Sequence, residues 1–209
     1  MEYRRCVIIG ASPDTDIAVL KREISSDDYV ICADGGYDYA KEAGIVPQLI
    51  VGDFDSTILD KDVKCEVITL PTRKDDTDMM VCIKEGIKRK FKIFSLFGAT
   101  GGRSDHTYAN ISALLYLTKN GCIGTIEDSK QRYLMLKKGT VKIRNESGKK
   151  FSIFPFGCAE CRVTLKGFEY QIEMYLLNAT SPIGVSNKVI SDEAIVSVHY
   201  GTALVITEK

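Results

Sequence analysis

The chain has 209 residues, which leaves room for one large domain or two modest ones, each with its own core. Hydrophobic residues make up 44% of the sequence and charged residues 27%, as in ordinary soluble globular proteins. Lys+Arg and Asp+Glu both number 28, so no excess of positive charge attracts the chain to nucleic acid or to an anionic membrane. The longest apolar runs have the length of strands, and none approaches a membrane-spanning helix.

The amino terminus and the cysteines predict a cytoplasmic protein. Residues 1–5 run straight into an apolar strand, without a hydrophobic signal segment or a small-residue cleavage site. The seven cysteines are odd in number and most lie in apolar segments, so we expect reduced core residues. Cys158 and Cys161 form a single CxxC pair, and His106 and His199 are not spaced to complete a zinc site.

Up to residue 126 the chain alternates between strand-like and helix-like segments. The expected strands are residues 6–9, 29–33, 49–51, 66–70, 92–97 and 121–126. The expected helices are residues 37–43, 77–90 and 104–119. This alternation predicts an α/β N-terminal domain with a mainly parallel sheet.

From about residue 130 the pattern changes to short runs in which apolar and polar residues alternate. These runs are residues 140–144, 150–154, 162–166, 170–176, 193–200 and 202–207. They predict an all-β antiparallel sandwich domain. The predicted domains are residues 1–126 and 132–209.

Six polar motifs, which together contain seven aspartates, follow the ends of apolar runs or open helices. They are Asp34-Gly35-Gly36, Gly52-Asp53-Phe54-Asp55-Ser56, Lys74-Asp75-Asp76-Thr77-Asp78, Gly98, Gly101-Gly102-Arg103 and Asp105-His106. The carboxyl ends of strands in an α/β sheet converge on one crevice. Two carboxylates about 4 Å apart repel by roughly 4 kcal/mol at an effective dielectric constant near 20, so such a group requires a cation. The motifs therefore predict a magnesium–nucleotide site.

Each motif also has a purely structural interpretation. Asp34-Gly35-Gly36 is consistent with a strand-to-helix turn in which glycine allows a positive φ. Asp53 and Asp55 could belong to a capped loop, but oxygen ligands two residues apart at a strand end suit Mg²⁺. The Asp and Thr residues of 74–78 can cap a helix, although capping does not explain three carboxylates in four positions.

The segment Gly101-Gly102-Arg103 leads into a helix whose amino end can bind phosphate. Glycines let the backbone approach a phosphate closely, and Arg103 can bind two phosphate oxygens at once. The chain contains no GxxxxGK[ST] sequence, so a Walker-type phosphate loop is excluded, and the segment from Gly98 does not match GxGxxG.

In order and spacing these motifs, together with Gly184-Val185-Ser186-Asn187, resemble the motif series of the thiamine pyrophosphokinase family. The resemblance spans most of the chain, including the change from α/β to all-β. It implies transfer of a pyrophosphoryl group from ATP to the hydroxyl of thiamine, leaving AMP, with Mg²⁺ as cofactor. It also implies a homodimer, in which the second domain binds thiamine, contributes to dimerisation and completes the site of the neighbouring subunit.

The resemblance also implies the roles of individual residues. Asp53, Asp55, Asp78 and Arg103 would be catalytic, and the three aspartates would bind the metal. The ATP and phosphate site would comprise Asp34, Gly35, Gly36, Asp75, Thr77, Gly101, Gly102, Arg103, Asp105 and His106. Ser186 and Asn187 would face thiamine.

The sequence departs from the family pattern in two places. Many relatives have Glu where this chain has Lys188, and some place a Trp against thiamine, whereas this chain has none. The aromatic residues that could replace the Trp are Phe154, Phe156, Tyr170 and Tyr175.

Two other functions are compatible with parts of the sequence. A phosphatase of the haloacid dehalogenase type would use Asp53 as nucleophile, because residues 53–57 imitate its DxDxT loop. That loop normally follows the first strand, whereas here it follows the third. A non-enzymatic nucleotide sensor would need the phosphate-binding groups but not so many carboxylates.

Overall fold

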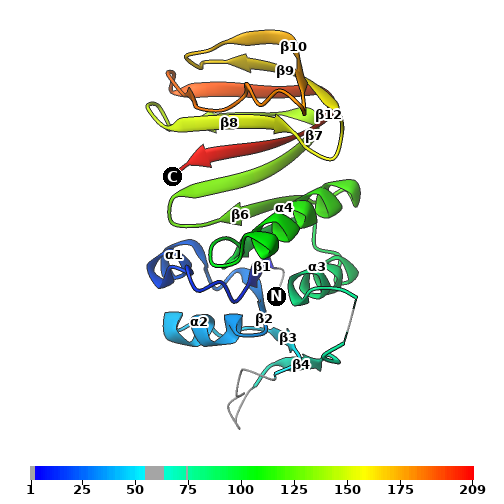
Figure 1. Cartoon of the computed structure of the whole chain (residues 1–209). Coiled ribbons are helices and arrows are strands. Elements are labelled where there is room, and N and C mark those ends of the chain that lie inside the picture. The colour runs from blue at the N-terminus through cyan, green and yellow to red at the C-terminus, as the bar shows by residue number, and fades with distance from the viewer. Residues whose placement is uncertain (1–2, 55–63, 74) are drawn as a thin grey trace. The chain divides into compact units, whose positions relative to one another are not determined.

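The computed structural model describes residues 3–54, 64–73 and 75–209. The chain divides into two compact units, Met1–Ser129 and Lys130–Lys209, each with its own set of strands. The first unit contains every α-helix found among the described residues, and the second consists of strands and turns (Figure 1).

The strands described in the first unit, β1 to β6, are parallel and have the order β4-β3-β2-β1-β5-β6. Its elements are β1 (Arg5–Ile9), α1 (Ile17–Glu23), β2 (Asp28–Ala33), α2 (Gly36–Ala43), β3 (Leu49–Gly52), β4 (Glu66–Thr69), α3 (Asp78–Lys88), β5 (Ile93–Phe97), α4 (Ser104–Lys119) and β6 (Ile123–Glu127). From β1 the chain builds outward through β2 to β4 and then returns to place β5 on the other side of β1. The carboxyl ends of β1 and β5 therefore form a topological switch point, where ligands bind in such folds.

Two pairs of helices cover this sheet: α1 packs against α2, and α3 packs against α4 (Figure 1). Val7 and Ile9 of β1 lie in one apolar cluster with Leu20 of α1 and Ala40 of α2. Gly36 allows α2 to approach β1, because a side chain at this position would lie 2.0 Å from the carbonyl oxygen of Ile9.

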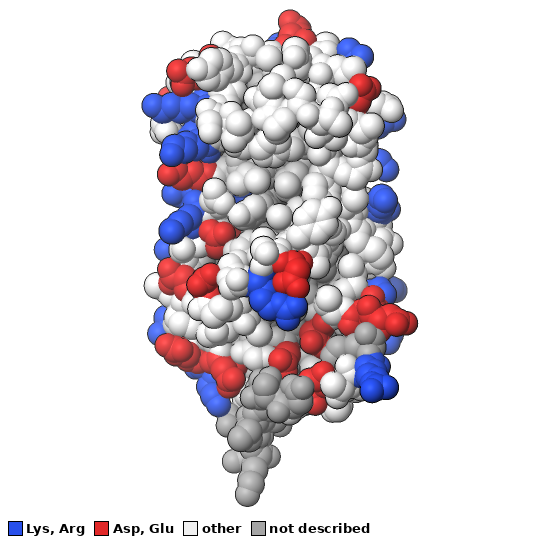
Figure 2. All heavy atoms as spheres, viewed as in Figure 1, with Lys and Arg blue, Asp and Glu red and all other residues white. Residues whose placement is uncertain are grey.

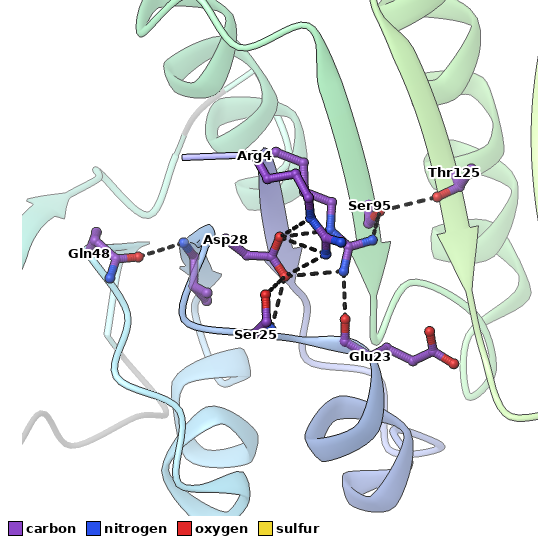
Figure 3. Close-up of polar contacts among 9 residues, drawn as sticks. Arg4, Glu23, Ser25, Asp28, Gln48, Ser95 and Thr125 are labelled. Carbon is purple, nitrogen blue, oxygen red and sulfur yellow. Dashed lines mark hydrogen bonds and ion pairs between the residues drawn. The ribbon is translucent and has the colours of Figure 1, made fainter. Parts of the chain in front are cut away.

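A buried ionic network joins the strands at the opposite, amino-terminal ends (Figure 3). Asp28, at the start of β2, is only 2% exposed and accepts hydrogen bonds from Arg5 Nε at 3.0 Å and Arg4 Nη2 at 3.1 Å. Arg5 also donates to Ser95 Oγ of β5 at 2.9 Å and to the carbonyl oxygen of Glu23 at 2.6 Å. The network thus ties β1, β2, β5 and the end of α1 together, away from the carboxyl ends of the strands.

Predicted and observed helices differ at three places, the smallest of which is that α2 begins at Gly36, one residue before the expected range 37–43. The sequence predicted no helix at α1, and the helix expected at 77–90 begins at Asp78, with Thr77 as its N-cap, and ends at Lys88. The Thr77 hydroxyl accepts a hydrogen bond from the Met80 amide at 3.2 Å, as a capping residue does. The helix expected at 104–119 has the predicted bounds.

The second unit is antiparallel throughout its described pairings. Its strands are β7 (Gln131–Arg144), β8 (Lys150–Pro155), β9 (Glu160–Lys166), β10 (Ile172–Asn178), β11 (Asn187–Lys188) and β12 (Glu193–Glu208). The long strand β12 pairs with β7 along both of its halves, with β9 along its first half and with β8 along its second.

The prediction of two separate strands at 193–200 and 202–207 was wrong, because β12 is continuous. Its register shifts between Val198 and Thr202, where Gly201 has a φ of +77°. Such a bend lets one strand pass from one sheet to another. Both halves contribute to a single apolar core, which includes Val196 and Val205. Together the two units confirm the predicted fold class, an α/β unit followed by an antiparallel β unit.

All seven cysteines are free thiols, and Cys6, Cys32, Cys82 and Cys161 are fully buried. Burial raises the pKa of the Cys161 thiol to about 12, which keeps it protonated and unreactive at neutral pH. In the described parts of the chain, no helix is long and apolar enough to cross a membrane.

Candidate active site

A cavity of about 500 Å³ lies at the switch point of the first unit. The described residues that line it come from the loop after β1 (residues 10–13), the end of β2, the start of α3, the loop after β5 and the first turns of α4. Seven of the predicted site residues are among them: Asp34, Thr77, Asp78, Gly101, Gly102, Arg103 and His106. Segments far apart in sequence therefore meet at one cleft.

The other predicted residues of this unit have different positions. Those described outside the cleft lining are Gly35, Gly36, Asp53, Asp75 and Asp105. Asp55 lies outside the described residues.

The turn after β2 is shaped by Asp34 rather than by its glycines. Asp34 has a φ of +46°, whereas neither Gly35 nor Gly36 has a positive φ, so the proposed reason for the glycines was wrong. Gly36 is instead needed for helix packing, and Gly52 packs closely against Asp34. A side chain at Gly52 would lie 3.1 Å from the Asp34 Cα atom, so Asp53 follows a residue in direct contact with Asp34.

The carboxylates of the segment before α3 point to different places. Asp78 lines the cleft, and one of its side-chain oxygens is removed from solvent. Asp76 forms an ion pair with Lys84 of α3, at 2.5 Å, and Asp75 is exposed. Of these three carboxylates, only Asp78 lines the cleft.

The carboxylate oxygens that line the cleft are suitable ligands for a hard divalent cation. Asp34 and Asp78 line the cleft with carboxylate oxygens, and such ligands suit Mg²⁺ rather than zinc. The described residues, which leave out Asp55, contain no group of three His, Cys, Asp or Glu side chains placed to hold a metal ion.

Residues 98–103, which we call the glycine turn, follow β5, and all of them except Thr100 line the cleft. Gly98, Gly101 and Gly102 have φ values of +58°, +89° and +59°, a region that glycine adopts readily and other residues do not. The Gly101 amide donates to the hydroxyl of Thr107 at 3.2 Å, and the Gly102 amide donates to Asp14 Oδ2 at 2.9 Å. Both amides thus have partners within the chain.

Arg103 lies at the exposed edge of the cleft and binds Asp105 through two hydrogen bonds, of 3.1 and 2.6 Å. The Arg103 guanidinium lowers the pKa of the Asp105 carboxyl to about 2, so the pair is ionised at neutral pH. Its side chains are 70% and 64% exposed, so solvent screens the attraction and the guanidinium can exchange partners.

Sequence reasoning missed part of the cleft. Residues 10–13 and Asn110 line it, and Asn110 donates to the carbonyl oxygen of Ala99 at 2.8 Å. Gly10 directly follows the first predicted strand, so the strand-end signal that identified Asp34 was present there too. Asn110 carries no comparable signal, because it lies in the middle of a predicted helix.

In the second unit, Ser186 and Asn187 have different surroundings. Ser186 is exposed, has a φ of +60° and donates its amide to Ser152 Oγ at 3.1 Å. Asn187 is 7% exposed, and its side chain binds both backbone groups of Tyr170: Oδ1 accepts from the Tyr170 amide at 3.0 Å, and Nδ2 donates to the carbonyl oxygen at 2.8 Å. Tyr170 is 67% exposed, more than Tyr175 at 44%, while Phe154 and Phe156 are half-buried.

Two sequence profiles match the chain, one in each unit. "Thiamin pyrophosphokinase, catalytic domain" matches residues 20–125, and "Thiamin pyrophosphokinase, vitamin B1 binding domain" matches residues 139–205. The thiamine pyrophosphokinase of Bacillus subtilis is 26% identical over 205 residues, which cover 95% of this chain and 96% of the relative.

Solved structures show the same architecture. The crystal structure of the Bacillus subtilis thiamine pyrophosphokinase superposes with a TM-score of 0.88 at 25% identity, with 98% of each chain covered. That of the Geobacillus thermodenitrificans thiamin pyrophosphokinase gives 0.84 at 26% identity, covering 98% of this chain and 97% of the other.

The profiles and the superposed structures are those of pyrophosphokinases, which are kinase-type transferases, and this chain is an enzyme of that class. The two profiles, which together span most of the sequence, make the assignment specific. The chain belongs to the thiamin pyrophosphokinase family.

Proposed function

We propose that this enzyme transfers the terminal diphosphate of Mg-ATP to the hydroxyl of thiamine, giving thiamine diphosphate and AMP. The main support is the cleft itself, because Asp34, Asp78 and Arg103 line a single cavity. Phosphoryl-type transfer depends chiefly on positioning and charge neutralisation, and this arrangement provides both kinds of group.

The aspartates and Arg103 have different roles in this proposal. Asp53, Asp55 and Asp78 would hold Mg²⁺, which neutralises phosphate charge when it is bound. Arg103 exchanges Asp105 for phosphate oxygens, since a carboxylate and a phosphate present similar acceptors to a guanidinium. Thr77 holds the start of α3, so that Asp78 keeps its direction into the cleft.

The second unit binds thiamine through Ser186 and Tyr170. Ser186 is exposed, and the Asn187 side chain holds the backbone of Tyr170 while the Tyr170 ring remains in solvent. A fixed, exposed aromatic ring suits a flat, positively charged heterocycle such as the thiazolium of thiamine. Asn187 then acts by positioning Tyr170.

We also propose that the enzyme is a cytoplasmic homodimer. The free, buried thiols agree with a reducing compartment. On the face shown in Figure 2, the surface over the strands of the second unit is largely uncharged. The exposed apolar residues of this unit include Met174, Leu176, Ile183 and Val185, and an exposed apolar surface of this kind favours association.

The test is a product analysis. Purified protein incubated with Mg-ATP and thiamine should form AMP and thiamine diphosphate in equal amounts, as measured by chromatography. ADP as the main nucleotide product would indicate a monophosphate kinase. Release of phosphate without thiamine would instead favour the phosphatase alternative at Asp53, and nucleotide binding without turnover would favour a sensor.

A further inference from the structure

We infer that Asp14 is a positioning residue that holds the glycine turn, residues 98–103, in the shape that binds the phosphates of ATP. The inference depends on the proposed role of this turn in phosphate binding. Asp14 lies in the loop between β1 and α1, and nothing in the sequence motifs connects it with the turn, 88 residues further along the chain.

The contact between Asp14 and the turn is direct. Asp14 Oδ2 accepts the hydrogen bond of the Gly102 amide at 2.9 Å, and a side chain at Gly101 would lie 2.0 Å from the same oxygen. Glycine is therefore required at position 101 for two reasons: its φ is +89°, and the Asp14 carboxylate leaves no space for a side chain. Glycine-rich turns have many accessible conformations, and a fixed acceptor at this point removes most of them.

A second connection holds the same two loops together. Ser12 Oγ donates to the carbonyl oxygen of Thr100 at 2.5 Å and accepts from the Asp14 amide at 3.3 Å. The Ser12 amide donates to the carbonyl oxygen of Gly98 at 3.2 Å. The loop after β1 thus binds the glycine turn at Gly98, Thr100 and Gly102, and Asp14 is the only carboxylate described in these contacts.

Asp14 supports the turn from behind. It is not among the residues that line the cleft, but it lines a separate small cavity with Thr100 and Asp128, whereas Gly102 and Arg103 line the cleft. The Asp14 carboxylate is therefore not part of the cleft lining, while its hydrogen bond holds Gly102, the residue that precedes Arg103. Preorganisation of this kind strengthens binding because less conformational freedom is lost when the ligand arrives.

The experiment measures the dissociation constant of a non-cleavable Mg-ATP analogue by calorimetry. Asp14→Ala should weaken binding about tenfold, because the turn must be ordered by the ligand itself. Asp14→Asn keeps an acceptor oxygen and should stay within about threefold of the unchanged enzyme. The matched control is Asp16→Ala, two residues away, which removes the N-cap of α1 and should lower Tm without changing analogue binding.

Equal analogue affinity in Asp14→Ala and the unchanged enzyme would overturn the inference, and so would tighter binding, which would mean that Asp14 competes with phosphate. If Asp14→Ala does not fold, Asp14→Ser, whose hydroxyl is too short to reach the Gly102 amide, takes its place. The KM for thiamine should not change in either variant. If the proposed function is wrong, the result is different: the unchanged enzyme binds the analogue but forms no thiamine diphosphate.

Discussion

Asp76 and Asp78 are close together in sequence, at the start of α3, but their side chains have different surroundings. Asp78 lines the cleft, whereas Asp76 is bound to Lys84 on the helix surface. One Asp78 side-chain oxygen is buried, whereas the Asp76 side chain is 38% exposed. The sequence alone did not distinguish these aspartates. In the structure α3 begins at Asp78, so Asp76 and Asp78 lie at different positions relative to the helix.

We therefore expect Asp78→Asn to lower kcat by about a hundredfold or more, because a charge that stabilises the transferring phosphates is lost. Asp76→Asn is the matched control and should keep activity within about twofold, since an exposed ion pair contributes little. Steady-state kinetics with both variants, checked for folding by circular dichroism, make the comparison. Similar losses in both would show that the segment acts only as a helix cap.

The elements of the first unit are held at opposite ends by different interactions. The loops that follow β1 and β5 line the cleft. At the other end of the sheet, the network around Asp28 joins β1 to β5. Burial raises the pKa of Asp28, but hydrogen bonds from Arg5, the Ser25 amide and Arg4 outweigh it, so the pKa lies below its ordinary value of 3.8. The ionised form is therefore the one that the folded protein prefers.

Asp28→Ala should reduce the free energy of unfolding by about 3 kcal/mol at pH 7, because it leaves the partly buried Arg5 without its only described carboxylate partner. Since the pKa of Asp28 is lower in the folded state, its contribution is present above pH 3.8 and decreases as pH falls toward the folded pKa. Urea unfolding at pH 7 and at pH 3 should show a smaller difference between variant and unchanged protein at the lower pH. An equal difference in the free energy of unfolding at both pH values would contradict a lowered pKa of Asp28 in the folded state.

Local signals predicted some elements well and others poorly. The helix at 104–119 has apolar positions along most of its length and stops at Asn120-Gly121, and its predicted bounds were correct. Helix α1 has only seven residues, too few for a periodic pattern. In β12, Gly201 resembled a turn between two strands, because a bend inside one long strand has the same local sequence as a turn.

The cleft was predictable where it depended on strand ends and unpredictable where it depended on topology. Asp34, Asp78 and Arg103 were found because polar residues after strands or before helices converge in a parallel sheet. Asp14 and Asn110 were not found, since their partners lie in other loops and only the strand order brings them together.

At the scale of the whole molecule, each unit has a separate apolar core, and each contains one part of the proposed chemistry. The first unit has the acidic cleft, and the second has the exposed Tyr170 held by Asn187. In the proposed function the first unit binds ATP and the second binds thiamine, so turnover in the proposed homodimer would need both units.

If the thiamine-binding unit serves the ATP-binding unit of the partner chain, two inactive variants should complement each other. Asp78→Asn chains mixed with chains that carry both Ser186→Ala and Tyr170→Ala should recover about a quarter of full activity, because half of the dimers are mixed and each has one intact site of two. Activity is measured after subunit exchange, with each variant alone as the control. No recovery, or a monomeric mass by light scattering, would refute the arrangement.

The continuous strand β12 also sets the order of events during synthesis. It pairs with β7, β8 and β9, and it is the last strand of its unit to leave the ribosome. Until it emerges, β7 has no partner on that side, and the core lacks Val196 and Val205. The first unit, whose last described strand is β6, can fold while the rest of the chain is still being made, whereas the second unit must wait for β12.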